Sequence, residues 1–209
     1  MRMRSAFSTA AAALLLLALA ACDALQDSGP PVHPNVIIIR EFAFSPGVVT
    51  LDPSFGFSLY RGAPGVPPRQ RAASVGRAVA FSVADAMAQQ LGQSGYDVIC
   101  SDTAMPEPGA RALIVSGTFR HIDEGRRRRV GAENPSVAVD AEIQYHAGRA
   151  APQRLAAFQI DSRQASGEVI AVSARQGADV KAASARLGGA IARYVADAAR
   201  LNKWPGAAR

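Results

Sequence analysis

Lysine, aromatic residues and cysteine are all scarce in this chain of 209 residues. Lys181 and Lys203 are its only lysines, 6% of its residues are aromatic, and two are cysteines. No apolar run reaches the roughly 20 residues that a bilayer-spanning helix needs. With 49% hydrophobic and 19% charged residues, the composition excludes a fibrous chain, a disordered chain and a multi-span membrane protein. The length fits one globular domain of roughly 100–200 residues.

Enzyme and nucleic-acid signatures are also absent from the sequence. It contains no HExxH, Walker A, GxGxxG or GxSxG motif, and no helix-turn-helix or aromatic-basic pattern. Asp140 and Glu142 share one face of a predicted strand, but nothing marks them as an acid and base pair. We therefore predict that the protein is not an enzyme, has no cofactor and does not bind nucleic acid. An envelope hydrolase with an unrecognised site stays as an alternative.

The three histidines are too far apart along the chain to suggest a metal site. His33 lies in a spacer, whereas His121 and His146 lie on predicted neighbouring strands. A turn centred near residues 129–130 places His121 opposite about residue 138 and His146 opposite about residue 113. Eight residues along a strand span roughly 26 Å, so the two histidines cannot share a metal ion.

The N-terminal residues have the pattern of a secretory signal. Arg2 and Arg4 precede an unbroken apolar stretch over residues 10–21, and polar, proline-rich sequence follows. A positive start before a short apolar run is typical of an exported protein. We predict a signal peptide over residues 1–21.

The end of that stretch, Leu19-Ala20-Ala21-Cys22, resembles a bacterial lipobox. The resemblance implies that Cys22 receives a diacylglyceryl group and becomes an acylated mature N-terminus, with palmitate among its chains. Two or more acyl chains anchor a protein stably to a membrane. We therefore predict a domain in the periplasm or cell envelope, tethered by lipid at Cys22; the inner and outer membranes both stay open. The alternative is an ordinary secretory signal with a nearby cysteine.

With Cys22 assigned to lipid, Cys100 has no partner for an intramolecular disulfide. Cys100 ends the apolar segment 96–100. We predict that its thiol packs in the core, as buried free cysteines do. A catalytic thiol would instead need a nearby base and an electropositive setting.

The remaining sequence divides into a tether over residues 22–34, one domain over 35–204 and a tail over 205–209. The tether is polar and contains three prolines. An apolar strand is predicted over residues 36–44. Residues 45–71 hold five prolines and four glycines, so a long loop is expected, with its aromatic residues covering the core or docking a partner.

The hydrophobic periods then predict two helices and four further strands. In one helix, at about residues 71–91, the buried stripe is Val75, Val79, Val83, Met87 and Leu91. In the other, at 179–201 with Asp179 as N-cap, it is Val180, Leu187, Ile191, Tyr194, Ala198 and Leu201. Strands are predicted at 96–100, 111–123, 136–146 and 153–163.

This order predicts a single two-layer α/β domain. The first strand, the first helix and the second strand form a crossover with parallel strands. The last three strands form an antiparallel meander, because short connections separate them. The sheet is therefore mixed and carries two main helices.

The segment Gly117-Thr118-Phe119-Arg120-His121-Ile122-Asp123-Glu124-Gly125, followed by an arginine run, resembles the signature of the DUF4410 domain family. That family comprises bacterial, often lipid-anchored proteins, and the resemblance would cover about residues 35–204. It implies no activity and no site residues. The sequence departs from the family pattern after Gly131, where residues 132–135 replace a glycine-rich stretch.

The same motif is predicted to form a hairpin. Gly125 allows the turn, and Asp123 can accept hydrogen bonds from local amides. Arg126, Arg127, Arg128 and Arg129 lie at or beside that turn. They are candidate partner-binding residues, because arginine pairs bidentately with carboxylates and phosphates. The alternative is a solvated loop that keeps a strand edge soluble.

A second basic stripe, Arg186, Arg193 and Arg200, recurs every seven residues on the last helix. It is typical of a solvated face, with partner binding as the alternative. The net charge is +6, or 21 − 17 = +4 once Arg2 and Arg4 are removed. A positive excess favours anionic headgroups or an acidic partner.

These observations favour a lipid-anchored envelope protein acting as a binding or scaffold module for a protein or glycan. An accessory lipoprotein of an envelope assembly or transport system is the alternative, suggested by architecture alone. The sequence leaves the partner and the oligomeric state open.

Overall fold

The computed structural model describes residues 32–52, 65–107, 109–126, 134–148, 151–165 and 179–204. Its elements are, in chain order, β1 (Val36–Ile39), the short 3-10 helix η1 (Pro46–Val48), β2 (Val49–Thr50), α2 (Pro68–Gln93), β3 (Val98–Cys100), β4 (Arg111–Asp123), β5 (Ser136–Ala147), β6 (Gln153–Asp161) and α3 (Val180–Leu201). The described part therefore contains every strand and both long helices predicted from the sequence.

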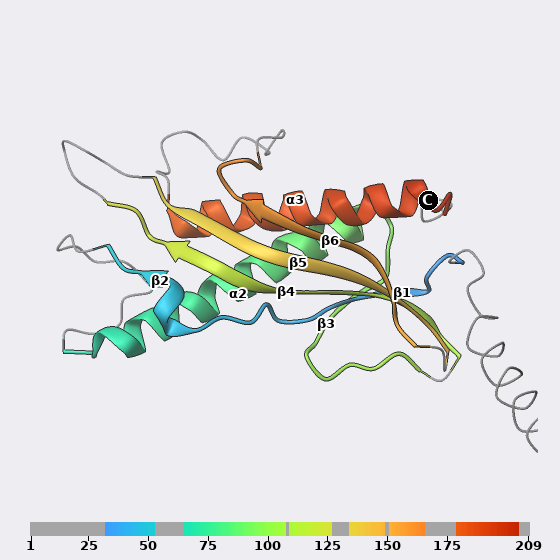
Figure 1. Ribbon diagram of the computed structural model, residues 1–209, viewed down its shortest axis with the longest axis horizontal. Coiled ribbons are helices and arrows are strands. Elements are labelled where there is room, and N and C mark those ends of the chain that lie inside the picture. Colours follow the sequence, from blue (N-terminus) through green and yellow to red (C-terminus); the bar gives the residue numbers. More distant parts are fainter. Residues whose placement is uncertain are drawn as a thin grey trace, which may run out of the picture. The chain divides into compact units, whose positions relative to one another are not determined.

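The strands form one mixed sheet in the order β3-β1-β4-β5-β6. β1 is parallel to β3 and to β4, and β2 continues along β4 beyond an isolated bridge between Ala43 and Thr118. β4, β5 and β6 form an antiparallel meander. Both long helices cover the same side of the sheet (Figure 1). The predicted two-layer α/β domain, with a crossover followed by a meander, is confirmed.

The core lies between this sheet and the helices. On α2 the predicted stripe from Val75 to Leu91 is entirely buried. Alternate residues of β5, from Val137 to Tyr145, point toward the helices and are buried too, as their period of two predicts. The helices therefore pack on the apolar side of β5, whose other side carries Asp140 and Glu142.

Glycine brings the two helices close together. A Cβ at Gly188 of α3 would lie 2.5 Å from the Val83 carbonyl oxygen and 2.9 Å from the Ala86 Cβ of α2. Those distances leave no room for a side chain. The backbones of α2 and α3 therefore lie so close at this point that only glycine fits at position 188.

A smaller apolar cluster lies on the opposite side of the sheet. Ile38, Ala112 and Ile114 are buried there, with Ala104 packed against them. The segment after β3 folds over these side chains, and its Ser101 amide donates to the Ile39 carbonyl at 3.0 Å. This second cluster explains why β1 is buried on both faces, as its unbroken apolar run predicts.

Three predictions about single apolar residues are wrong. Cys100 is exposed, because β3 is an edge strand and its last residue projects beyond the core. Tyr194 is 44% exposed and stacks on Phe158 with ring centroids 4.2 Å apart, at the margin of the core rather than within it. Leu201 is 84% exposed, because it ends α3.

Element boundaries differ slightly from the predictions. α2 begins at Pro68 rather than Arg71, because proline at the first helical position has a suitable φ and needs no amide partner. β3 begins at Val98 rather than Tyr96, and β6 ends at Asp161 rather than Arg163. Within residues 45–71, the described part contains η1 and β2 as well as the start of α2.

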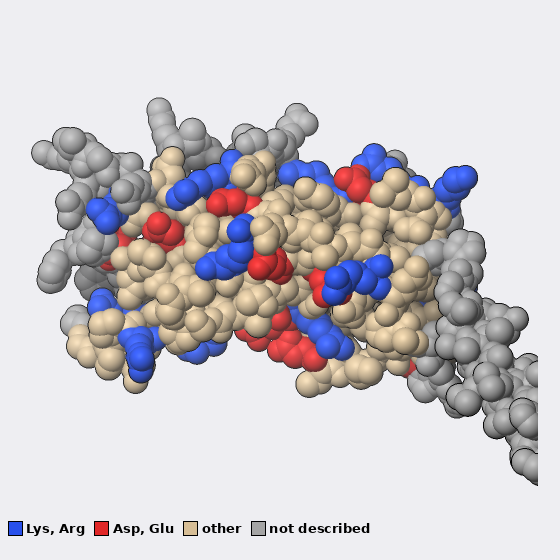
Figure 2. Space-filling model, in the orientation of Figure 1, with Lys and Arg blue, Asp and Glu red and all other residues tan. Residues whose placement is uncertain are grey.

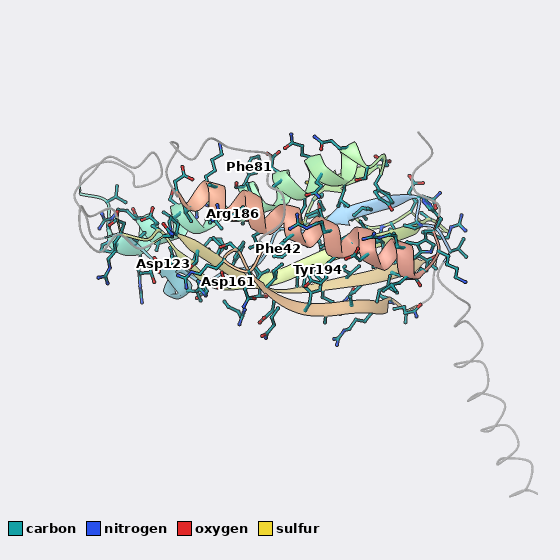
Figure 3. The ribbon with its side chains drawn as sticks, turned by 90° about the horizontal axis from the view of Figure 1, so that it is seen from above. Phe42, Phe81, Asp123, Asp161, Arg186 and Tyr194 are labelled. Carbon is teal, nitrogen blue, oxygen red and sulfur yellow. The ribbon has the colours of Figure 1, made fainter. Side chains whose placement is uncertain are left out.

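Charged side chains of both signs are interspersed over the face shown in Figure 2. Seen from above, α3 lies over the sheet with Tyr194 and Arg186 along it, and Phe42 lies beneath the helical layer (Figure 3). No described helix is long and apolar enough to cross a membrane.

Candidate partner-binding tip

The predicted arginine cluster begins where β4 ends. Arg126 is the last described residue of this segment and is exposed, whereas Arg127, Arg128 and Arg129 lie outside the described residues. Cys22 and the predicted signal peptide and tether up to residue 31 also lie outside them. The described residues begin again at Asn134, and β5 pairs with β4 from Ser136 onward. We call residues 121–126, with Ser136 and Asp161, the tip.

The predicted local turn is present at the tip. The Asp123 Oδ1 accepts a hydrogen bond from the Gly125 amide at 2.8 Å. Gly125 has φ = 72°, in the left-handed region that favours glycine. The side chain of the aspartate and the freedom of the glycine therefore fix the direction in which the chain leaves β4 toward Arg126.

Glu124 fixes the tip to a distant segment. Its side chain is 9% exposed, and its Oε2 accepts a hydrogen bond from the Asp52 amide at 3.1 Å. Its own amide donates to the Thr50 carbonyl at 3.1 Å. The sequence did not indicate this role, because a glutamate in a polar turn is ordinarily read as solvated. Glu124 thus joins the end of β4 to the chain that follows β2.

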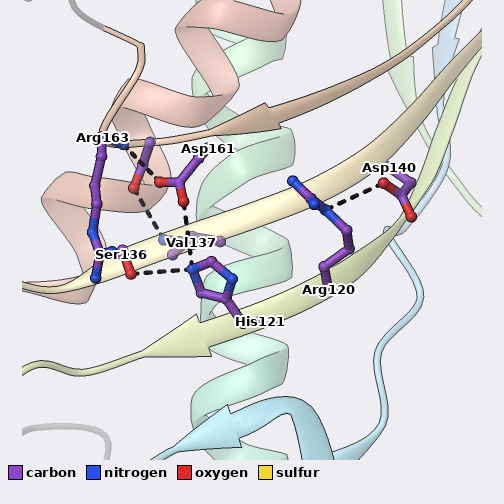
Figure 4. Close-up of polar contacts among 8 residues, drawn as sticks. Arg120, His121, Ser136, Val137, Asp140, Asp161 and Arg163 are labelled. Carbon is purple, nitrogen blue, oxygen red and sulfur yellow. Dashed lines mark hydrogen bonds and ion pairs between the residues drawn. The ribbon is translucent and has the colours of Figure 1, made fainter.

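His121 connects three strands at the tip (Figure 4). Its Nε2 lies 3.1 Å from the Ser136 Oγ on β5 and 3.7 Å from the Asp161 Oδ2 on β6. His121 pairs with Ala138, the position that the sequence predicted for its neighbour. A register shift between Phe119 and His121 lets both Arg120 and His121 reach the outer side of the sheet.

The trio of serine, histidine and aspartate does not have the arrangement of a nucleophilic triad. In a triad the serine and the carboxylate contact different imidazole nitrogens. Here both approach Nε2 of His121, and Ser136 is fully buried. The geometry instead suits a polar link that holds β4, β5 and β6 together.

The turn after β6 is held against the start of β5. The Asp161 Oδ1 accepts from the Arg163 amide at 2.8 Å. The Ser162 Oγ accepts from the Val137 amide at 3.0 Å, and the Ser162 amide donates to the Val137 carbonyl at 2.8 Å. Figure 4 shows the contact between Asp161 and Arg163 beside the imidazole of His121. The chain on both sides of the tip is therefore fixed by hydrogen bonds.

Away from the tip, the outer side of the sheet carries two cross-strand ion pairs. Arg120 Nε lies 3.2 Å from Asp140 Oδ1, and Arg154 Nε lies 2.7 Å from Glu142 Oε1. Hydrogen bonds from Gln144 and then Arg154 lower the pKa of Glu142 below its ordinary value. Asp140 and Glu142 are thus engaged by cations on neighbouring strands. This is the ordinary behaviour of a half-solvated sheet face.

The first glycine of the motif has a packing role. A Cβ at Gly117 would lie 2.5 Å from both the Asp140 carbonyl oxygen and the Phe42 ring. Phe42 is fully buried and packs at a tilt against Phe119, with ring centroids 5.9 Å apart. Phe42 therefore packs against Gly117 and Phe119. The motif alone could not identify Phe42 as their packing partner.

Among the described residues, no group of three or more His, Cys, Asp or Glu could hold a metal ion. His121 and His146 lie on β4 and β5 as predicted, and His146 pairs with Ala112, one residue from the predicted position. The candidate site stays the one predicted from the sequence, the arginine run that begins at Arg126, where the tip ends.

The fold is that of a two-layer α/β domain with a mixed sheet. No family model matches the chain, and no curated protein matches it either. The resemblance to the DUF4410 family therefore stays a prediction.

Three solved structures are similar to the chain at low identity. A protein from Xanthomonas campestris of the family DUF330 has a TM-score of 0.42 at 11% identity, over 85% of this chain and 92% of its own. A hypothetical protein from Chlamydia trachomatis has a TM-score of 0.34 at 12% identity, over 82% and 98%. A neuraminyllactose-binding hemagglutinin homologue from Helicobacter pylori has a TM-score of 0.30 at 9% identity, over 81% and 87%. At these values the similarities define neither a family nor a function for this chain.

Proposed function

We propose that this protein is a lipid-anchored module of a bacterial envelope, and that the arginine run that begins at the end of its tip binds an acidic protein or an anionic glycan. Cys22 would carry the lipid, and Arg126, Arg127, Arg128 and Arg129 would contact the partner. An accessory lipoprotein of an assembly or transport system is one form that such a module can take.

The observation that supports this proposal is the way the tip is built. Three side chains fix the end of β4. Asp123 accepts a hydrogen bond within its own turn, and Glu124 accepts one from the Asp52 amide. His121 contacts β5 and β6. A solvated loop needs no such attachment on three sides. A segment that emerges from a fixed base loses less conformational entropy when it binds, which favours affinity.

The chemistry of the segment defines its partner. Four adjacent arginines repel one another unless anions lie between them, so bound carboxylate, phosphate or sulfate groups would relieve the repulsion. Such binding would be sensitive to salt, because exposed charges are screened over a distance of about 8 Å at physiological ionic strength.

A crosslinking pull-down of the lipidated protein in cells tests this proposal. The test variant changes Arg126–Arg129 to Ser. A matched control removes four arginines spread over the rest of the surface: Arg69, Arg120, Arg154 and Arg200. We expect a partner that crosslinks to the wild type and to the control and is lost from the test variant. Equal recovery with both variants would exclude the tip as the binding site, and no specific partner with any of them would refute the binding module.

Lipidation is tested separately by metabolic labelling with radioactive palmitate. We expect label on the wild-type chain and none on a Cys22→Ser variant, because Cys22 is the cysteine of the segment that resembles a lipobox. Label on both proteins, or on neither, would contradict the anchor. A Cys100→Ser variant is the matched control and keeps the label.

A further inference from the structure

The charges of the domain are divided unequally between its two layers. The helices α2 and α3 contain seven basic and two acidic residues, so their net charge is 7 − 2 = +5. The strands β1 to β6 contain three basic and four acidic residues, so theirs is 3 − 4 = −1 with neutral histidines. Among the residues of these helices and strands, the positive excess therefore lies in the helices.

The predicted arginine stripe lies on the outer side of this layer. Arg186, Arg193 and Arg200 project from the side of α3 opposite its buried residues, such as Leu187, Ile191 and Val195. A repeat of seven residues spaces them by about 10.5 Å along the helix. Arg200 pairs with Asp197, whereas Arg186 and Arg193 have no carboxylate partner in the described part of the chain.

An exposed aromatic residue lies on the same layer. Phe81 of α2 is 74% exposed, the highest exposure among the aromatic side chains in the described ranges. Arg77 precedes it by one helical turn and is exposed as well. Figure 3 shows Phe81 on α2 and Arg186 on the neighbouring α3, both over the same side of the sheet. The helical layer thus combines unpaired guanidinium groups with a large apolar side chain.

We propose that this helical face, formed by Arg77, Phe81, Arg186 and Arg193, docks on an anionic phospholipid bilayer. The arginines would pair with headgroup phosphates, and Phe81 would enter the interface between headgroups and acyl chains. Both contacts are those by which amphipathic helical surfaces bind membranes. The inference rests on the proposed lipid anchor, which brings the face to the membrane.

The predicted tether makes weak docking effective. His33 lies 11 positions after Cys22, so the tether reaches at most about 36 Å. Attachment by such a tether makes docking intramolecular, with an effective concentration of the order of millimolar. Each arginine near an anionic surface is worth about 1 kcal/mol, which multiplies the ratio of docked to undocked protein by about five.

Docking through the helices also orients the tip. The sheet would lie over the helices on the side away from the bilayer, with its ion pairs in solvent. β4 runs about 40 Å from Arg111 to Asp123 and would lie along the membrane. Arg126 would then face a partner beside the protein on the same membrane rather than one far above it.

Fluorescence quenching on vesicles tests the docked face. The full lipidated protein carrying Phe81→Trp is reconstituted into phosphatidylcholine vesicles or into vesicles with about one third phosphatidylglycerol, each with brominated acyl chains. Subtraction of the wild-type signal removes the contribution of Trp204, which is buried. We expect quenching of the new tryptophan in the anionic vesicles and little in the neutral ones.

Charge variants of the reporter protein complete the test. Arg186→Gln with Arg193→Gln should lower the docked ratio about 25-fold, from about fivefold per arginine. Arg120→Gln with Arg154→Gln removes the same charge from the open sheet face and should change the ratio of docked to undocked protein little. Equal quenching in both vesicles, or equal effects of the two pairs of substitutions, would overturn the proposal. Failure to reconstitute at all would instead refute the lipid anchor, so the two proposals fail in different ways.

Discussion

At the scale of single residues, Gly117 shows how closely the sheet and the chain after β1 approach each other. Replacement of Gly117 by Ala would place a methyl group 2.5 Å from the Asp140 carbonyl oxygen and from the Phe42 ring. Because one of these neighbours is backbone, the strand itself must shift. Overpacking of this kind costs about 1–3 kcal/mol.

We therefore expect Gly117→Ala to lower the free energy of unfolding by about that amount, measured by urea denaturation. Gly92→Ala is the matched control, because a Cβ there meets nothing within 4 Å. In a helix this change should stabilise the protein by about 0.5–1 kcal/mol. Unchanged stability of the Gly117 variant would contradict the contact.

Cys100 gives a second prediction at this scale. Although the residue as a whole is exposed, partial desolvation of its thiol, and then the negative charge of Asp85, raise the pKa of Cys100 above the ordinary value. The thiolate is the reactive form, so Cys100 should be alkylated more slowly near pH 8 than an unperturbed cysteine.

Asp85→Asn should lower the pKa of Cys100 and speed its alkylation, because the repelling charge is removed while the surroundings stay apolar. The measurement is the pH dependence of iodoacetamide labelling at Cys100, followed by mass spectrometry. Asp97→Asn serves as a control of equal charge change. A rate profile that is identical with and without Asp85 would refute the electrostatic contribution.

At the scale of elements, the start of α3 is stabilised by its N-cap residue, Asp179. The Asp179 Oδ1 accepts from the Ala182 amide at 2.8 Å and so satisfies one of the free amides at the helix start. Asp179→Ala should cost about 1 kcal/mol of unfolding free energy, the usual value for loss of an N-cap.

Asp179→Ser should restore most of that stability, since serine also caps helices. Urea denaturation of the three proteins measures the difference. Asp197→Ala, which removes the same charge from the exposed end of α3, is the control. If alanine and serine at position 179 were equally stable, the cap would contribute nothing.

Elements with a strong period were predictable from sequence, and contacts between elements were not. The alternation from Val137 to Tyr145 predicted β5, and a turn centred near residues 129–130 predicted the pairing of His121 with Ala138. The burial of Glu124 depends on Asp52, far away in the chain. No local sequence pattern predicts a contact between residues so far apart in the chain.

The same reason explains the errors. Cys100 has an apolar neighbourhood in the sequence, but the position of β3 at the sheet edge decides its exposure. Tyr194 has the right helical spacing for the core, yet it lies beside Phe158 at the margin. A hydrophobic period identifies the buried side of an element, and sheet order decides how far that side is covered.

At the scale of the whole molecule, the described elements that bury the core all lie within residues 33–204. Both apolar clusters, the sheet and the helices lie in that range. His33 stacks on Tyr96 with ring centroids 6.4 Å apart, and the Asn35 amide donates to the Arg111 carbonyl at 2.7 Å. These contacts fix the start of the domain to β4 and to the end of α2.

A chain beginning at His33 should therefore fold with the stability of the mature lipidated protein. We expect the two unfolding free energies to agree within about 0.5 kcal/mol, as for changes at a surface, with both proteins measured in the same mild detergent. A second chain beginning at Phe42 removes β1, whose Ile37, Ile38 and Ile39 are buried, and should not fold. A clear loss of stability in the first chain would show that residues before His33 stabilise the domain, and the lipid tether would then be part of the fold rather than a flexible link to the membrane.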